Sequence, residues 1–81
     1  MKYYVYILVS LKSGIRYVGM TEDVEKRLEQ HNKGKSKFTK GHIPWELKYF
    51  EELETRIKAR EREKYLKSGV GREYISKILA S

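Results

Sequence analysis

The run of residues from Tyr3 to Val9 is the feature that most constrains how this chain can fold. It reads Tyr-Tyr-Val-Tyr-Ile-Leu-Val, an unbroken series of aromatic and branched aliphatic side chains without Gly or Pro. The run is far shorter than the roughly 20 residues that span a bilayer, and its composition predicts a strand covered on both faces. Because 81 residues can bury only one modest core, we expect a single domain over residues 1–81.

A β-hairpin is expected from the residues that follow this run. Ser10–Gly14 has the composition of a turn, and Ile15–Met20 has that of a returning strand. With a four-residue turn, Tyr6 would lie opposite Tyr17, and both hydroxyls would project from one side of the sheet. Gly19 would leave its backbone open to close approach by another group. The alternative is an aromatic pair that only stabilises the hairpin.

The rest of the sequence predicts three helices and one more strand. We expect a helix over 24–31, capped by Thr21 or Asp23, and then a loop over 33–44. A half-buried strand should follow over 45–53, beginning at a core Trp45. The chain should end with a helix over 55–68, stopped by Gly69, and a short helix after residue 71. The predicted fold is α+β and sandwich-like: a small three-stranded antiparallel sheet flanked by helices, in the order β-β-α-β-α-α.

The first two predicted helices both carry charged groups on the stripe that their apolar residues assign to the core. The spacing is i, i+3, i+4 in both, with a fourth member at i+7: Val24, Arg27, Leu28 and His31, then Ala59, Arg62, Glu63 and Leu66. A charged group on a buried stripe requires a partner or a purpose. Either Arg27 and Glu63 form an ion pair, or long side chains reach solvent at the edge, or these residues belong to a functional site.

The charge balance indicates a polyanionic partner. Lys and Arg number 18 against 11 Asp and Glu, a formal net charge of +7. This favours nucleic acid, although charge of this size also serves solubility. Four lysines lie in the loop after the first predicted helix and are expected to contact phosphates without reading bases: Lys33, Lys35, Lys37 and Lys40. Phe38 is expected to pack under this loop, with stacking on an exposed base as the alternative.

The remaining composition bounds the compartment and the chemistry. The sequence contains no cysteine, which excludes disulfides, thiolate metal sites and cysteine nucleophiles. Without a recognisable signal peptide or a membrane-length apolar run, the protein is expected to be cytoplasmic, with no membrane partner. A monomer is favoured.

Taken in order, these residues resemble the GIY-YIG nuclease superfamily over essentially the whole chain. Tyr4-Val5-Tyr6 stands where that family has Gly-Ile-Tyr, and Tyr17-Val18-Gly19 where it has Tyr-Ile-Gly. The helix with Arg27 and His31 resembles the family's arginine- and histidine-bearing helix, and Ala59–Lys67 resembles its glutamate-bearing helix. The stretch 67–72, Lys-Ser-Gly-Val-Gly-Arg, resembles the small stand-alone bacterial members. Two departures are Tyr4 in place of glycine and the lack of an asparagine after Gly69.

The resemblance implies a divalent-metal-dependent endonuclease that cuts DNA by structure rather than by sequence. Glu63 would hold Mg²⁺ or Mn²⁺, and Arg27 would neutralise transition-state charge. Tyr6 or Tyr17 would orient or deprotonate the attacking water. A phenol with a pKa of about 10 requires a nearby cation for that role, supplied by Arg27, the metal or His31. His31 would hold or protonate one of the tyrosines, or simply cap its helix.

Two other functions remain open on the sequence. Because the late asparagine is missing, the chain can be a nucleic-acid-binding module that keeps the scaffold with little or no catalysis. It can also be a protein-interaction domain in which the buried charges are purely structural.

Overall fold

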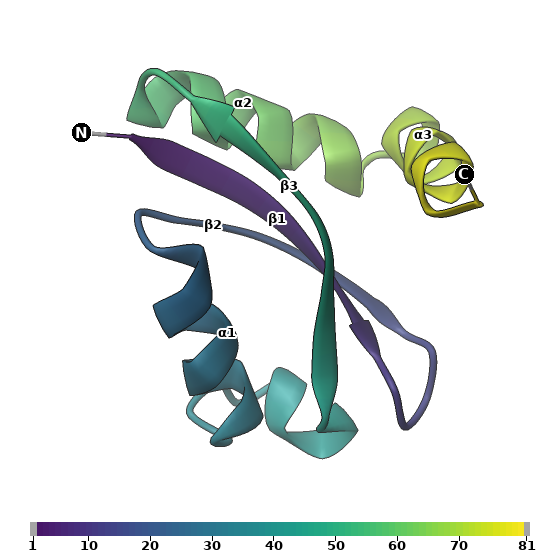
Figure 1. Ribbon diagram of the computed structural model, residues 1–81. Coiled ribbons are helices and arrows are strands. Elements are labelled where there is room, and N and C mark those ends of the chain that lie inside the picture. Colours follow the sequence, from purple (N-terminus) through teal and green to yellow (C-terminus); the bar gives the residue numbers. More distant parts are fainter. Residues whose placement is uncertain (1, 81) are drawn as a thin grey trace.

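The computed structural model describes residues 2–80 and has the predicted α+β architecture (Figure 1). The elements are β1 (Tyr3–Ser10), β2 (Arg16–Thr21), α1 (Val24–Asn32), a short 3₁₀ helix (Thr39–His42), β3 (Trp45–Leu53), α2 (Arg56–Lys67) and α3 (Gly69–Ala80). The predicted order β-β-α-β-α-α is confirmed. None of the helices in the described range is long and apolar enough to cross a membrane.

The strand predicted from the opening run lies in the middle of the sheet. The strand order is β2-β1-β3, with antiparallel pairing on both sides of β1. Helix α1 covers one face, whereas α2 and α3 cover the other (Figure 1). Val5 and Ile7 pack toward α2 and α3, and Tyr6 and Leu8 pack toward α1. Burial of both faces explains why the run has no polar alternation.

Strand β3 changes face partway along, which the sequence did not predict. Trp45 and Leu47 pack in the cluster under α1, but Tyr49 and Leu53 pack under α2 and α3. The pairing with β1 shifts between Ile7 and Leu8, so that one extra residue is inserted on β3. Trp45, Leu47, Tyr49 and Leu53 are buried or half-buried, as their shared parity predicted, but a β-bulge turns the last two to the opposite face of the sheet.

The hairpin register also differs from the prediction by two residues. Tyr6 lies opposite Gly19, and Leu8 lies opposite Tyr17. The turn keeps the predicted length of four residues but lies one residue later, at 11–14, because Ser10 continues the strand, with its N–H bonded to the Ile15 carbonyl at 2.9 Å. The Ser10 hydroxyl accepts N–H bonds from Lys12 and Ser13, and Gly14 takes a φ of 77°. Because the shift is even, Tyr6 and Tyr17 remain on one face, as predicted.

The corner between α2 and α3 corrects the prediction that the last helix begins only after residue 71. Gly69 is the first residue of α3, and Ser68 joins the two helices. Gly71 lies inside α3 at the point of closest approach to α2. A Cβ on Gly71 would lie 1.9 Å from the Tyr65 carbonyl oxygen and 2.6 Å from the Leu66 Cα. The glycine is required for helix packing rather than for flexibility.

The predicted N-caps are in place. Asp23 accepts the Lys26 N–H at the start of α1, and Thr55 accepts the Lys58 N–H at the start of α2. These bonds satisfy backbone donors that the first turn leaves without partners. They fix where the two helices begin, and hence where Arg27 and Glu63 lie.

Candidate active site

Tyr6 is the centre of the candidate site, and Gly19 makes room for it. The Tyr6 side chain is 1% exposed and lies on the α1 face of the central strand. A Cβ on Gly19 would lie 2.5 Å from the Tyr6 hydroxyl oxygen and 3.0 Å from a ring carbon of Tyr17. The group predicted to approach Gly19 closely is therefore Tyr6 itself. The Tyr6 and Tyr17 ring centroids are 6.3 Å apart.

His31 joins the two tyrosines from the last turn of α1. Its side chain is fully buried, with Nε2 at 3.0 Å from the Tyr6 hydroxyl and its ring centroid at 5.0 Å from that of Tyr17. Nδ1 lies 2.8 Å from the hydroxyl of buried Thr39. Thr39 was missed because the loop before β3 gave no helical signal. Its contact with His31 depends on the 3₁₀ turn that forms there.

The pKa of His31 identifies it as a neutral imidazole. Burial, together with the smaller effect of the nearby Arg27 guanidinium, lowers this pKa to about 4. His31 therefore does not supply the cation that the sequence-based hypothesis allowed it to supply. A neutral ring offers one nitrogen as a proton acceptor and the other as a donor.

Arg27 is close enough to influence both buried groups. Burial raises the pKa of Tyr6 to about 12, while Arg27 opposes this increase and the charges of Tyr17 and Glu63 add to it. In the free protein the phenol is thus protonated at neutral pH, and Arg27, one of the three cations suggested, does not by itself bring the pKa of Tyr6 below its ordinary value. Desolvation outweighs one half-buried guanidinium. The Arg27 side chain itself donates to Gln30 Oε1 at 3.0 Å.

Glu63 approaches the same centre from α2. Its side chain is only 17% exposed, and its Oε2 accepts from Lys67 Nζ at 3.1 Å. The suggested Arg27–Glu63 ion pair is not among the salt bridges of residues 2–80, since each residue makes a separate bond. The charges of Tyr17, Arg27 and Glu63 all act on the pKa of the Tyr6 hydroxyl. Contacts between side chains join Tyr6, Tyr17 and His31, and electrostatic effects link Arg27 and Glu63 to that cluster.

Arg62 lies on the same stripe of α2 as Glu63, but its contacts serve the packing of the fold. Its guanidinium makes two 2.8 Å bonds to the Glu51 carboxylate and lies over the rings of Tyr65 and Tyr74. Burial alone would raise the pKa of Glu51, but the bonds from Arg62 and Tyr49 outweigh it and hold this pKa below its usual range. Of the two charged groups on this stripe, Arg62 ties α2 to β3, and Glu63 is left facing the site.

The residues present fit one hard divalent cation, held together with substrate. No group of three or more His, Asp or Glu side chains capable of holding a metal occurs among the described residues. Magnesium commonly binds through one or two carboxylates and completes its shell with water and substrate phosphate. A single half-buried carboxylate beside the tyrosine cluster satisfies that requirement. It would hold a cation weakly until a phosphate is bound.

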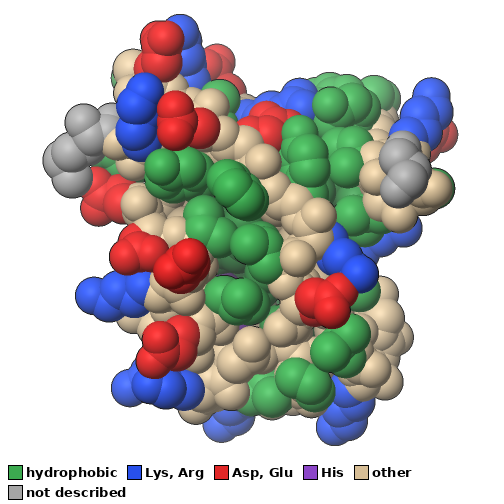
Figure 2. Space-filling model, in the orientation of Figure 1, with side chains coloured by type: hydrophobic (Ala, Val, Ile, Leu, Met, Phe, Trp, Pro, Cys, Tyr) green, Lys and Arg blue, Asp and Glu red, His purple; other side chains and the backbone are tan. Residues whose placement is uncertain are grey.

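The lysines of the loop are exposed, as a phosphate-contacting role requires. Lys35, Lys37 and Lys40 all extend to solvent, whereas Lys33 is also exposed but pairs with Glu29. Elsewhere the charge is mixed. The face in Figure 2 has hydrophobic side chains near its centre, with acidic groups beside Lys and Arg around its edge. The net charge of +7 therefore does not make this face uniformly basic.

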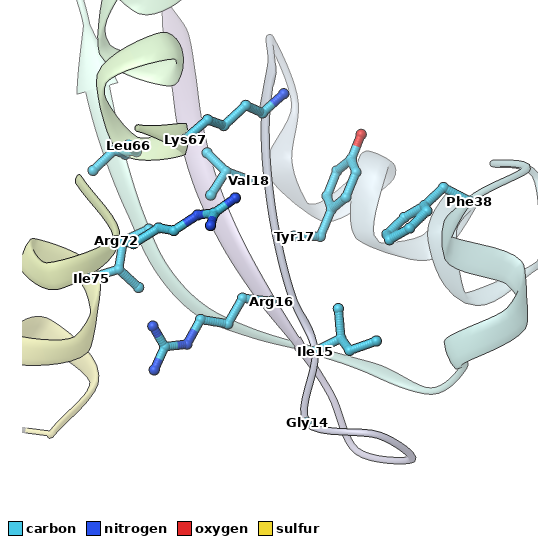
Figure 3. Close-up of a pocket in the computed structure, with 10 residues that line it drawn as sticks. All are labelled: Gly14, Ile15, Arg16, Tyr17, Val18, Phe38, Leu66, Lys67, Arg72 and Ile75. Carbon is cyan, nitrogen blue, oxygen red and sulfur yellow. The ribbon is translucent and has the colours of Figure 1, made fainter. Parts of the chain in front are cut away.

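A cavity of about 630 Å³ opens beside the candidate site, along the free edge of β2 (Figure 3). Tyr17 lines it and also contacts Tyr6 and His31, so the cavity and the tyrosine cluster share a wall. Three cations from three elements also line it: Arg16 on β2, Lys67 on α2 and Arg72 on α3. The sequence analysis did not single them out, because only the packing of α3 against α2 brings Arg72 to this edge.

The buried state of His31 gives a testable pH dependence of stability. In the unfolded chain His31 binds a proton near its ordinary pKa of 6.5, but in the folded protein only near pH 4. Stability should therefore fall as the pH drops from about 6.5 to 4, by roughly 2–3 kcal/mol from this residue. Urea unfolding across this range measures the effect. His31→Gln should lose that component, and His42→Gln should retain it; equal pH profiles for both variants would contradict the assignment.

Comparison with known proteins identifies the family. The chain is 45% identical to a UPF0213 protein of Clostridium perfringens over 65 residues, 79% of this chain and 69% of that protein. It is 41% identical to a UPF0213 protein of Staphylococcus saprophyticus over 68 residues, 83% and 82% of the two chains. The solution NMR structure of the UPF0213 protein BH0048 from Bacillus halodurans matches with a TM-score of 0.58 and 33% identity, covering 96% of this chain and 85% of that one.

The family comparison agrees with the residues that form the cluster. Residues 2–75 match the family model of the GIY-YIG catalytic domain, a span that contains both tyrosine tripeptides, Arg27, His31 and Glu63. The resemblance seen in the sequence is confirmed, and with it a nucleic-acid substrate class. On this match the chain belongs to the GIY-YIG family of nucleases.

Proposed function

We propose that this protein is a divalent-metal-dependent endonuclease that hydrolyses DNA phosphodiester bonds and selects its substrates by structure rather than by sequence. The observation that carries the proposal is the convergence on the Tyr6 hydroxyl of groups from the hairpin, α1 and α2. They supply a proton acceptor, a guanidinium and a carboxylate, the functions that phosphodiester hydrolysis requires. The cysteine-free composition fits a reducing compartment such as the cytoplasm.

Tyr6 and His31 would together remove a proton from the attacking water. With the His31 proton on Nδ1 and bonded to Thr39, Nε2 accepts from the Tyr6 hydroxyl. As the Tyr6 oxygen takes a proton from water, its own proton passes to Nε2. The hydroxide forms the new P–O bond as the bond to the leaving sugar oxygen breaks, and that oxygen keeps the bonding electron pair and takes up a proton from solvent. This route avoids a free phenolate, which the raised pKa of Tyr6 disfavours.

The remaining groups would stabilise charge and position the phosphate. Arg27 offers a planar fork that matches two phosphate oxygens, worth about a hundredfold in rate. Tyr17, half-buried at the rim of the cluster, would hold the water or the phosphate. Glu63 would hold Mg²⁺ or Mn²⁺, which when bound supplies positive charge to the phosphate oxygens. The exposed loop lysines would contact phosphates farther along the strand.

A second candidate is a nucleic-acid-binding module on the same scaffold. Two observations favour it: the raised pKa of Tyr6 and the lack of any asparagine in α3, residues 69–80. Such a module would bind DNA with strong salt dependence and leave it intact.

The two candidates differ in one experiment. Linear and branched DNAs are incubated with the protein in Mg²⁺, in Mn²⁺ and in excess chelator. The nuclease proposal predicts cleavage of branched DNA that requires metal and ceases in chelator. Salt-sensitive binding of every DNA, with no product in either metal, would instead select the binding module.

A further inference from the structure

The cavity beside Tyr17 combines features of a site for a single nucleotide. Phe38 lines it and is 56% exposed, although its ring stacks on Tyr17 with centroids 6.1 Å apart and an interplanar angle of 28°. Contact with the His42 ring further limits its movement. The expectation that Phe38 packs under the loop was therefore wrong: the ring is held in place but remains accessible. Held, exposed aromatic rings are the surfaces on which unpaired bases stack.

The opposite wall of the cavity supplies cations. In Figure 3, Lys67 and Arg72 extend from the helices toward the side on which Tyr17 and Phe38 lie, whereas Arg16 points the other way, toward α3, and donates to the Ser76 hydroxyl at 3.0 Å. None of the ten lining residues is acidic. The side chains of Val18, Leu66 and Ile75 give the cavity an apolar floor. The cations match a phosphate, the aromatic ring matches a base, and the apolar floor matches a sugar.

The cavity is also continuous with the proposed reaction centre. Tyr17 belongs to both, and Lys67 bonds directly to Glu63. A strand whose phosphate lies between Tyr6 and Glu63 would thus place its neighbouring nucleotide in the cavity. The volume of about 630 Å³ falls within the usual range for ligand pockets.

We infer that this cavity binds an unpaired nucleotide next to the bond to be cut, with its base on Phe38 and its phosphates on Lys67 and Arg72. A base within a duplex has both ring faces covered, so only a single-stranded tail, flap or junction strand can present one to Phe38. This inference rests on the proposed function and gives it a substrate class: DNA with unpaired nucleotides adjoining the cleavage site.

The test compares two probes in the absence of divalent metal. One is a blunt DNA duplex, and the other is the same duplex with a short unpaired tail; fluorescence anisotropy measures binding of each at one fixed salt concentration. The wild type should bind the tailed probe at least about fivefold more tightly, the low end for stacking one base on an aromatic ring. Phe38→Ala should abolish this preference, and Phe38→Trp should retain it.

Phe50→Ala is the matched control, because Phe50 is 52% exposed on β3 and contacts Tyr4 rather than the cavity. It should keep the tail preference. Arg72→Gln should weaken binding of both probes and reduce the salt dependence, whereas Arg60→Gln, exposed on α2 outside the cavity, should do neither.

Equal affinity of the wild type for the two probes, or a preference that survives in Phe38→Ala, would overturn the inference. Its failure is distinguishable from failure of the proposed function. Binding is measured without metal, so a protein that cuts nothing can still show the tail preference. A metal-dependent nuclease without that preference would refute the cavity assignment alone.

Discussion

Replacing Glu63 by Gln is expected to reduce metal-dependent DNA cleavage by about a thousandfold or more. Glu63 is a half-buried carboxylate, and its charge contributes to the raised pKa of the Tyr6 hydroxyl. A bound divalent cation supplies several kcal/mol of transition-state stabilisation, and an amide does not hold it. The fold should survive, since the change removes only one i,i+4 bond to Lys67, worth a few tenths of a kcal/mol. Single-turnover cleavage in saturating Mg²⁺ is the appropriate measurement.

Glu61→Gln is the matched control for this variant. Glu61 lies on the same helix two residues earlier, but it is exposed. It should cut at the wild-type rate, so that a loss in Glu63→Gln cannot be attributed to the change in net charge. Comparable rates in all three proteins would mean that Glu63 does not hold the metal.

Replacing Gly71 by Ala is expected to have the largest effect on stability. The added methyl group would lie 1.9 Å from the Tyr65 carbonyl oxygen and 2.6 Å from the Leu66 Cα, both of which are backbone atoms. Neither atom can move without shifting α2 relative to α3. Overpacking of this kind costs about 3 kcal/mol, which in a domain of this size lowers Tm by roughly 10–20 °C. Thermal unfolding followed by circular dichroism measures it.

Gly69→Ala controls for helix propensity. Nothing lies within 4 Å of a Cβ at Gly69, which also occupies helix α3. Its variant should be within about 1 kcal/mol of the wild type, on the stabilising side. If the Gly71→Ala and Gly69→Ala proteins had the same Tm, α2 and α3 would not pack closely at Gly71.

The candidate site could be predicted because it depends on short-range periodicity. Tyr6 and Tyr17 share a face under any even shift of the hairpin register, so the error of two residues did not separate them. The i, i+4 spacing of Arg27 and His31 likewise places both on one side of α1, whatever the helix packs against. To predict the position of Glu63, one must also know that its helix covers the sheet.

The parts that could not be predicted depend on tertiary contacts. The position of the hairpin turn, one residue later than predicted, depends on hydrogen bonds of the Ser10 side chain, which composition does not specify. The β-bulge in β3 moves the side chains after it to the opposite face of the sheet, although the sequence of the strand alternates regularly. The pKa of Tyr6 depends on burial beneath α1. The effect of burial, which raises this pKa, is larger than the opposite effect of the Arg27 guanidinium, which the sequence placed nearby. Arg72 reaches the cavity only because Gly71 allows α3 to pack against α2.

The most direct test of the central claim is to locate the metal. Mn²⁺ is titrated into isotope-labelled protein bound to a DNA whose scissile phosphate carries a non-cleavable substitution, and paramagnetic broadening of the NMR signals is recorded. If the tyrosines, the guanidinium and the carboxylate surround one phosphate, the signals of Tyr17, Arg27 and Glu63 should broaden first and together. Broadening that begins at the exposed carboxylates of Glu52 or Glu61, with the Glu63 signal unchanged, would contradict that arrangement.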